Sequence, residues 1–349
     1  MISLATTDTP PKTYFNIIDC LKSGRLGRGK YVTLLEERAK KYFGVKHCIA
    51  VANGTLADIL MLATLKVMNP GKTEVILPAH TFIAQANAVL WAGLKPVFVD
   101  TDSRGGFAPD EEEVKKLINK ETLCYFPVHL LGTGGLRCFD PGVPILEDCC
   151  EAMGGEWFDG KKFGTFGIAG AFSMYPSHTI TTGEGGLIIT NSAQFANICR
   201  SIHNHGKSGS DFDFNYVGIN AKMTNLQAAI GCELIETIDK VNEKRRRNVA
   251  LYNEILGYEF YASAPHCFPV LFRNMGHRDY ALDILATQGI EARKLMGCIP
   301  ESKPFKDSFG GDIEKYPKAQ YLANCGLFLP IHQNLKKREI ERICDVLPR

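Results

Sequence analysis

Short apolar runs alternate along the first half of the chain with segments whose apolar residues recur at helical spacing. The apolar runs are HCIAVAN, EVILPA, PVFVD, TLCYFPVH, PILED, GAFSMYP and GGLIITN. The segments of helical period between them cover residues 55–68, 81–92 and 109–118. Because the strands are apolar throughout and alternate with helices, we predict an α/β fold: a mostly parallel sheet with helices on both faces, in three αβα layers.

The strand pattern weakens after Asn191. Helical stretches follow at residues 222–237 and 239–256, and then come a short strand-like run, CFPVLF, a helix from His277 and a last helix from Leu335. This change predicts a large domain over residues 1–240, with the N-terminal arm included, and a small C-terminal α+β domain over residues 241–349.

The charge balance indicates neither a nucleic-acid partner nor a membrane partner, since Lys+Arg 40 and Asp+Glu 38 leave a net charge of +2. The basic run at residues 244–247 lies within a predicted helix, and we expect it to be a solvated helix face. No apolar stretch reaches the roughly 18–20 residues of a membrane span. The first residues show no basic segment followed by an apolar one, so we expect no signal peptide and a cytoplasmic protein.

The sequence contains 12 cysteines, scattered through apolar runs, and none of them has CxxC or CxC spacing. This distribution is typical of reduced core cysteines, and we interpret Cys149 and Cys150 as packing residues. His203 and His205 lack carboxylate or cysteine partners at ligand spacing. We therefore predict no metal site.

Three segments carry candidate chemistry. Gly54 and Thr55 follow a predicted strand and open a helix, where free backbone N–H groups suit a phosphate, although an ordinary helix cap has the same pattern. Asp148 ends the strand PILED, and a carboxylate at that end faces the crevice in which α/β folds bind ligands. Such a carboxylate can keep a pyridine nitrogen protonated. Ser173 precedes a turn that contains a proline, and the glycines of GEGG follow it.

Taken in order, these segments resemble the sugar-nucleotide aminotransferases, a family of fold-type I enzymes dependent on pyridoxal 5′-phosphate (PLP). The matching blocks here, from about Ser23 to Pro330, read SGRLGRG, NGT, LPAHTF, PVFVD, VHLLG, EDCCE, FSMYPSH, GEGG and VGIN. The resemblance implies that Gly54, Thr55 and Ser173 hold the cofactor phosphate. It also implies that Phe82 stacks on the pyridine ring and that Asp148 pairs with the ring nitrogen.

Two more positions complete the implied cofactor site. Asn220 resembles the family's asparagine that reaches a phosphate across a dimer interface, which implies a homodimer with shared active sites. Glu151 stands where the family's EDxxQ block has glutamine or histidine.

The family's cofactor-bonding lysine falls at position 178, where this chain has histidine. Imidazole forms no stable imine, but with a pKa near ~6.5 it is a competent base at neutral pH. Glu151 and the segment GIEARKLMGCIPESKPF also resemble a lysine-less subgroup, the 4-keto-6-deoxy sugar-nucleotide 3-dehydratases. The resemblance therefore implies that His178 replaces the lysine as base.

The implied reaction removes the C3 hydroxyl of a nucleotide-linked 4-keto-6-deoxy sugar. It uses PLP and its pyridoxamine form (PMP), with L-glutamate as amino donor. His205 and Arg293 are candidate substrate contacts, although His205 is also compatible with a plain surface-loop histidine. The stretch from Gly206 to Asn220 is short compared with many relatives, so the nucleotide and the sugar epimer stay open. Two alternatives stay open as well: an aminotransferase whose lysine has been replaced, and a non-catalytic PLP-fold binding protein.

Overall fold

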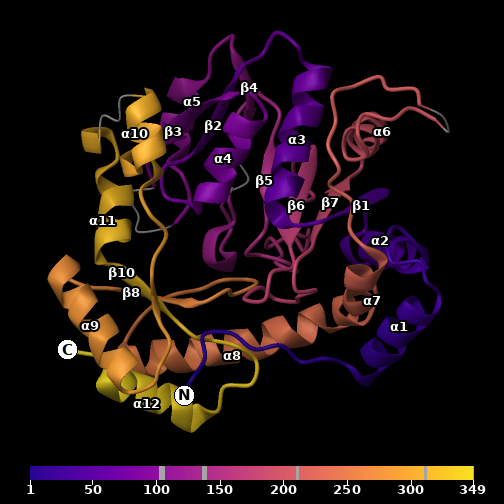
Figure 1. Ribbon diagram of the computed structural model, residues 1–349. Coiled ribbons are helices and arrows are strands. Elements are labelled where there is room, and N and C mark those ends of the chain that lie inside the picture. The colour runs from indigo at the N-terminus through magenta and orange to yellow at the C-terminus, as the bar shows by residue number, and fades with distance from the viewer. Residues whose placement is uncertain (102–106, 136–139, 210–211, 310–312, 349) are drawn as a thin grey trace.

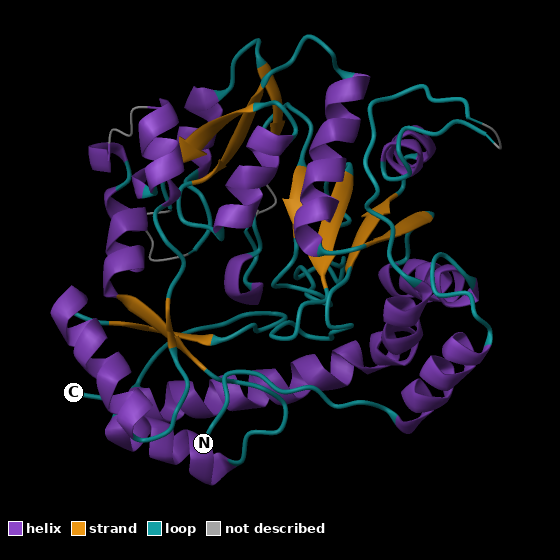
Figure 2. Cartoon of the chain, in the orientation of Figure 1, coloured by secondary structure: helices purple, strands orange, loops and turns teal. Residues whose placement is uncertain are grey.

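A mixed β-sheet forms the centre of the larger part of the molecule (Figures 1 and 2). The computed structural model describes residues 1–101, 107–135, 140–209, 212–309 and 313–348. The sheet order, from one edge to the other, is β1 (His47–Val51), β7 (Gly186–Thr190), β6 (Ala169–Ser173), β5 (Leu146–Asp148), β4 (Thr122–Tyr125), β2 (Glu74–Pro78) and β3 (Lys95–Val99).

The sheet is mostly parallel, as the apolar pattern predicts. Only β7 runs antiparallel to its described neighbours, β1 and β6. Isolated parallel bridges, Tyr125 to Ile145 and Val128 to Asp148, join β4 to β5. The carboxyl ends of β2, β4, β5 and β6 therefore meet at one edge of the sheet, where α/β folds bind ligands.

Helices cover both faces of this sheet. Cys48 and Ala50 of β1 point into one core, and Ile49 and Val51 point into the other. This alternation follows from the two-residue period of a strand. Helices α2 and α7 contribute to the first core, whereas α3, α4 and α6 contribute to the second. The predicted three-layer αβα arrangement is confirmed.

The helices have the following bounds: α1 (Pro11–Lys22), α2 (Lys30–Phe43), α3 (Gly54–Met68), α4 (Ile83–Trp91), α5 (Glu111–Leu117), α6 (Ala193–Ile202), α7 (Asn225–Leu234), α8 (Ile238–Leu256), α9 (Met275–Thr287), α10 (Lys303–Phe309), α11 (Pro317–Cys325) and α12 (Lys337–Val346). Short 3-10 turns are η1 (Leu130–Gly132), η2 (Ile235–Thr237), η3 (Ile299–Glu301) and η4 (Ile313–Lys315). None of the described helices is both long and apolar enough to cross a membrane.

A small antiparallel sheet forms the C-terminal part, with the order β8 (Phe268–Leu271), β10 (Gly326–Leu329) and β9 (Arg293–Lys294). The first residues of the chain pack here as well, since Ile2 pairs with the segment around Ile290. The predicted boundary at residue 240 falls within the first turn of α8, the long helix that runs below the central sheet in Figure 1.

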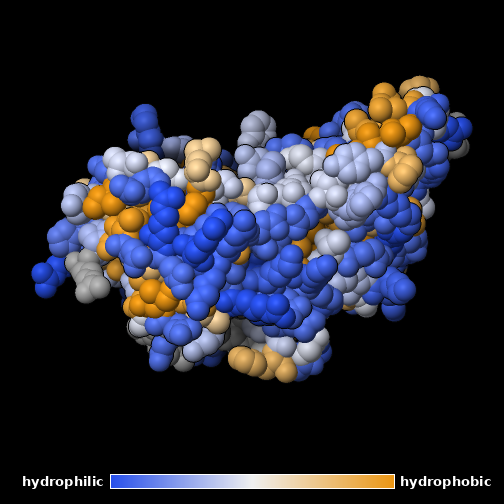
Figure 3. All heavy atoms as spheres, turned by 90° about the horizontal axis from the view of Figure 1, so that it is seen from below, coloured by the Kyte–Doolittle hydropathy of each residue, from blue (hydrophilic) through white to orange (hydrophobic). Residues whose placement is uncertain are grey.

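The basic run on α8 corrects one prediction. Arg246 and Arg247 are exposed, as a solvated helix face requires, but Arg245 is only 1% exposed. The face of the molecule seen from below is mostly hydrophilic, with hydrophobic groups gathered near its edges (Figure 3). Arg245 does not belong to that surface, because it points inward between α8 and the segments that precede β8 and follow β6.

Glu147, the first carboxylate of the PILED strand end, has a structural role. It is fully buried, and its Oε1 accepts hydrogen bonds from the N–H groups of Phe166 and Gly167, both at 2.8 Å. Its Oε2 accepts one from the Gly164 N–H and lies 3.0 Å from His129 Nε2. The carboxylate thus fixes the loop that leads into β6.

We predict that Glu147→Ala lowers the free energy of unfolding by about 3–5 kcal/mol, because it leaves several buried donors without an acceptor. Urea unfolding monitored by circular dichroism measures the change. The control, Glu156→Ala, removes an exposed carboxylate paired with Lys162 and should cost less than about 1 kcal/mol. Equal losses in the two variants would contradict the structural role.

Candidate active site

The predicted phosphate-binding residues meet at the start of α3. A Cβ atom on Gly54 would lie 2.7 Å from Ser173 Cβ and 2.9 Å from Cys150 Sγ, so only glycine leaves room there. Asn53 caps the helix by accepting a hydrogen bond from the Leu56 N–H. Thr55 is exposed at the same helix end. The arrangement offers backbone N–H groups and hydroxyls to an anion at the positive end of a 15-residue helix.

Asp148 lies beside this helix end, at the last residue of β5. It is 6% exposed, and its Oδ1 accepts a hydrogen bond from the Cys150 N–H at 3.0 Å. Burial raises the pKa of Asp148, and no cationic side chain among the described residues forms an ion pair with it. A buried carboxylate in such a place suits a cationic group of a ligand, such as a protonated pyridine nitrogen.

Asp58 of α3 is a neighbour that the sequence reasoning missed. One carboxylate oxygen of Asp58, one of Asp148 and the Cys150 Sγ atom all lie within 4.8 Å of one another. Burial, and then the charge of Asp148, raises the pKa of Asp58 well above its usual value. Two such carboxyl groups do not both ionise unless a cation joins them. The available signal was an acidic residue inside the apolar helical run TLADILML.

Phe82 lies at the same edge of the sheet, in the connection that leaves the carboxyl end of β2. The residue is 58% exposed, which is unusual for a phenylalanine and makes it accessible to a ligand. The structure therefore brings Gly54, Ser173 and Asp148 together, with Phe82 on the same edge.

His178 lies on the turn after β6. Its Nδ1 is 3.2 Å from the carbonyl oxygen of Ser173. Since a carbonyl only accepts hydrogen bonds, Nδ1 carries the proton of the neutral ring and Nε2 keeps the lone pair. Burial lowers the pKa of His178 to about 4; the hydrogen bond with the Ser173 carbonyl opposes this shift, and the charge of Arg245 adds to it. His178 is therefore neutral at pH 7, with a basic nitrogen available.

His266 lies next to His178, and Glu151 lies next to His266. The rings of His178 and His266 are 5.2 Å apart and nearly perpendicular, and His266 Nε2 lies 3.8 Å from Glu151 Oε1. Glu151 also accepts a hydrogen bond from the Leu131 N–H, and burial raises its pKa to about 7. His266 was not predicted, because a single histidine before a strand has no distinguishing pattern.

Asn220 and His205 lie close together. An isolated antiparallel bridge joins Asn204 to Asn220, and the His205 N–H donates to the carbonyl oxygen of Ile219 at 3.0 Å. A cavity of about 430 Å³ opens there, and His205, Lys207 and Lys222 are among its lining residues. Asn220 is exposed, as is required of a residue that reaches another subunit.

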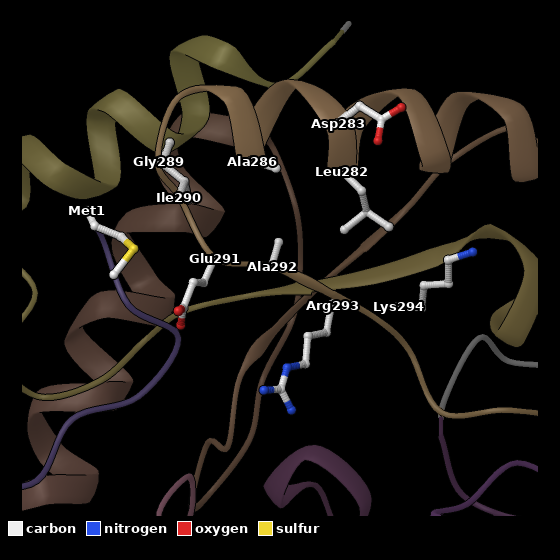
Figure 4. A pocket seen from close by; sticks show the side chains of 10 residues that line it. All are labelled: Met1, Leu282, Asp283, Ala286, Gly289, Ile290, Glu291, Ala292, Arg293 and Lys294. Carbon is white, nitrogen blue, oxygen red and sulfur yellow. The ribbon is translucent and has the colours of Figure 1, made fainter.

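Arg293 lies on the edge strand β9, in the wall of a second cavity of about 610 Å³. Met1, Glu291 and Lys294 are other residues of this wall, and the Arg293 side chain points away from α9 (Figure 4). Arg293 forms no hydrogen bond or ion pair with any described residue. Its predicted contact with substrate stays a prediction.

The comparisons with known proteins agree with this architecture. The model of the DegT/DnrJ/EryC1/StrS aminotransferase family matches residues 12–348. GDP-perosamine synthase of Vibrio cholerae is 35% identical, over 97% of this chain and 96% of the relative. The structure of E. coli GDP-4-keto-6-deoxy-D-mannose-3-dehydratase with bound hydrated PLP matches with a TM-score of 0.90 and 27% identity, over 100% of both chains. A structure of GDP-4-keto-6-deoxymannose-3-dehydratase with a trapped PLP-glutamate geminal diamine gives 0.86 and 26%, again over 100% of both.

We predict that Gly54→Ala weakens PLP binding by at least about tenfold, equivalent to ~1.4 kcal/mol, because the new methyl group collides with Ser173 and Cys150. Fluorescence titration of the cofactor-free protein with PLP measures the affinity. Gly71→Ala is the control, since a Cβ there meets nothing within 4 Å. Unchanged affinity in Gly54→Ala would place the cofactor phosphate elsewhere.

Proposed function

Because the chain belongs to the DegT/DnrJ/EryC1/StrS aminotransferase family, we propose that it is a PLP-dependent 3-dehydratase of a nucleotide-linked 4-keto-6-deoxy sugar. The observation that carries the proposal is His178, which stands at the lysine position of the family. Its described neighbours are Ser173, Tyr175, Arg245 and His266, and none of them supplies a replacement amine.

The candidate cofactor site supports dependence on PLP. Gly54 and Ser173 would hold the phosphate at the start of α3, and Asp148 would keep the ring nitrogen protonated. When bound, the pyridoxamine form supplies an amino group that bonds to the sugar ketone, together with a ring that withdraws electrons from the adjacent carbon. Phe82 would pack against the ring and exclude water from it.

His178 supports elimination of the C3 hydroxyl as the reaction. Its Nε2 atom would take the proton from the cofactor carbon C4′ and would carry it while the C3 hydroxyl departs. The ring is held by Ser173 through Nδ1, and its low pKa keeps it in the base form above about pH 4. Glu151 would act on His178 only indirectly, through His266, whose Nε2 lies 3.8 Å from Glu151 Oε1.

Glutamate is the proposed amino donor, since one of the matching dehydratase structures contains a PLP-glutamate geminal diamine. Glutamate would give its amino group to the cofactor and leave as 2-oxoglutarate. Amino transfer from glutamate and loss of the C3 hydroxyl together reduce the sugar at C3, with 2-oxoglutarate and ammonia as the other products.

A homodimer with shared active sites is also proposed. Helix α1 buries the small or polar residues Thr13, Asn16 and Cys20, and it exposes an apolar face: Tyr14, Phe15, Ile18 and Leu21. An exposed apolar face of this kind is typical of an interaction surface. Asn220 is exposed as well, and would contact the cofactor phosphate of the partner subunit.

A second candidate function is 4-amino transfer without loss of water. The 35% identity to GDP-perosamine synthase favours it. Product analysis separates the two reactions, because amino transfer keeps the nitrogen on the sugar and elimination releases it as ammonia.

We predict that the protein, supplied with PLP, L-glutamate and GDP-4-keto-6-deoxy-D-mannose, forms a 3-deoxy sugar with equal amounts of 2-oxoglutarate and ammonia. A second nucleotide-linked 4-keto-6-deoxy sugar is tested in parallel. His178→Ala should lower the rate by about 10²–10⁴-fold, the usual contribution of a general base. Mass spectrometry of the sugar and enzymatic ammonia assays give the readout.

His277→Ala is the matched control, because His277 is exposed on α9 and should leave the rate unchanged. A stable aminosugar as product would establish the aminotransferase instead. Absence of turnover with both sugars would favour a binding protein, and full activity of His178→Ala would remove the histidine from the reaction.

A further inference from the structure

We propose that Arg245 is a positioning residue for His178: it fixes the backbone that carries this histidine and the backbone that leads into His266. The proposal rests on the proposed function only in calling His178 the base. Arg245 would not touch substrate or cofactor.

The hydrogen bonds of Arg245 join two segments that are far apart in the sequence. Its Nη2 donates to the carbonyl oxygen of His178 at 2.9 Å, and its Nη1 donates to the carbonyl oxygen of Pro265 at 3.3 Å. Pro265 directly precedes His266, whose ring packs against the ring of His178. One rigid guanidinium therefore sets the relative position of both histidines.

The charge of Arg245 has no counter-ion among the described residues. The side chain is 1% exposed, the two acceptors of its hydrogen bonds are neutral carbonyls, and its Nε has no hydrogen-bond partner among those residues. Burial lowers the pKa of Arg245 to about 10, so the guanidinium still carries its charge at neutral pH. An uncompensated buried cation reduces stability, and an apolar side chain would fill the same space at lower cost. A contribution to stability alone therefore does not explain why an arginine is buried at this position.

Three histidines lie within the influence of this charge. Burial is the first cause of the low pKa of His178, of His266 and of His332, and the charge of Arg245 lowers the pKa of each further. A cation that is held in place beside a base makes the protonated base less favourable.

One of the other groups around His178 acts in the opposite direction. The carbonyl oxygen of Ser173 accepts a hydrogen bond from Nδ1, which raises the pKa of His178, and the ring of Tyr175 lies 6.1 Å from that of His178. Glu151, the one nearby carboxylate among the described contacts, lies beyond His266, and burial raises its pKa to about 7. His178 therefore stays neutral unless it receives a proton from the reaction itself.

The test separates the charge of Arg245 from its hydrogen bonds. Arg245→Lys keeps the charge but loses the rigid two-point contact, whereas Arg245→Met loses both. Arg247→Met is the control, since it makes the same change on the exposed side of α8. Histidine-selective ¹⁵N NMR of the cofactor-free protein, assigned with His178→Asn, gives the pKa and the tautomer of His178 without any turnover. The pH dependence of kcat is measured alongside.

In Arg245→Met we expect the pKa of His178 to rise measurably above about 4, while burial keeps it below the unperturbed value of ~6.5. The acid limb of kcat should move up with it. Arg245→Lys should leave the pKa nearly unchanged but lower kcat by about tenfold, because the ring is less well placed. Arg247→Met should match the wild type in both.

A His178 pKa in Arg245→Met equal to that of Arg247→Met would overturn the effect of the charge. Unchanged kcat in Arg245→Lys would overturn the positioning. If Arg245→Met does not fold, Arg245→Gln, which removes the charge but keeps a donor, replaces it with the same expected pKa change. Failure of dehydration in the wild type would refute the proposed function and leave the NMR result intact.

Discussion

The removal of ionisable side chains from water governs the chemistry at the carboxyl edge of this sheet. Asp148 is the last residue of β5, Asp58 lies close to it on α3 and Glu151 follows β5 in the chain; burial raises the pKa of each. Burial lowers the pKa of His178 and His266 at the same edge. Each of these groups is therefore biased toward its neutral form, and a charge that enters with a ligand meets partners that gain by pairing with it. Asp148 and Asp58 lie close together near the start of α3, whereas Glu151 lies close to His266.

The strands of the central sheet were predictable because they are buried on both sides and apolar throughout, as in β1 and β7. Helix α1 was not predicted, because its buried side carries Thr13 and Asn16 while its apolar residues face outward. Such an exposed apolar face is typical of an interaction surface. Arg245 was placed on the wrong side of α8, since a run of basic residues does not reveal which member points inward. Asp58 and His266 depend on contacts between distant segments, and no local pattern reports such contacts.

Sequence identity and the candidate active site favour different reactions. Identity over the whole chain reports mainly on the shared fold, and the chain is 35% identical to GDP-perosamine synthase. The reaction depends on the group at position 178, and a histidine there cannot form the covalent bond that a lysine makes with the cofactor. On the proposed function, Gly54, Ser173 and Asp148 would serve amino transfer and elimination equally well, because both need the same cofactor held in the same way. The proposed difference between the two reactions therefore rests on His178.

The surroundings of position 178 suit either side chain. Burial and the charge of Arg245 disfavour any positive charge there, so they would keep a lysine amine unprotonated, as a nucleophile must be. They have the same effect on an imidazole, and leave it as a neutral base. A change from lysine to histidine then needs no new electrostatic environment; it removes the covalent bond and keeps the proton acceptor. The guanidinium of Arg245 is compatible with both residues, because it binds the backbone carbonyl of residue 178, which is present whichever side chain stands there.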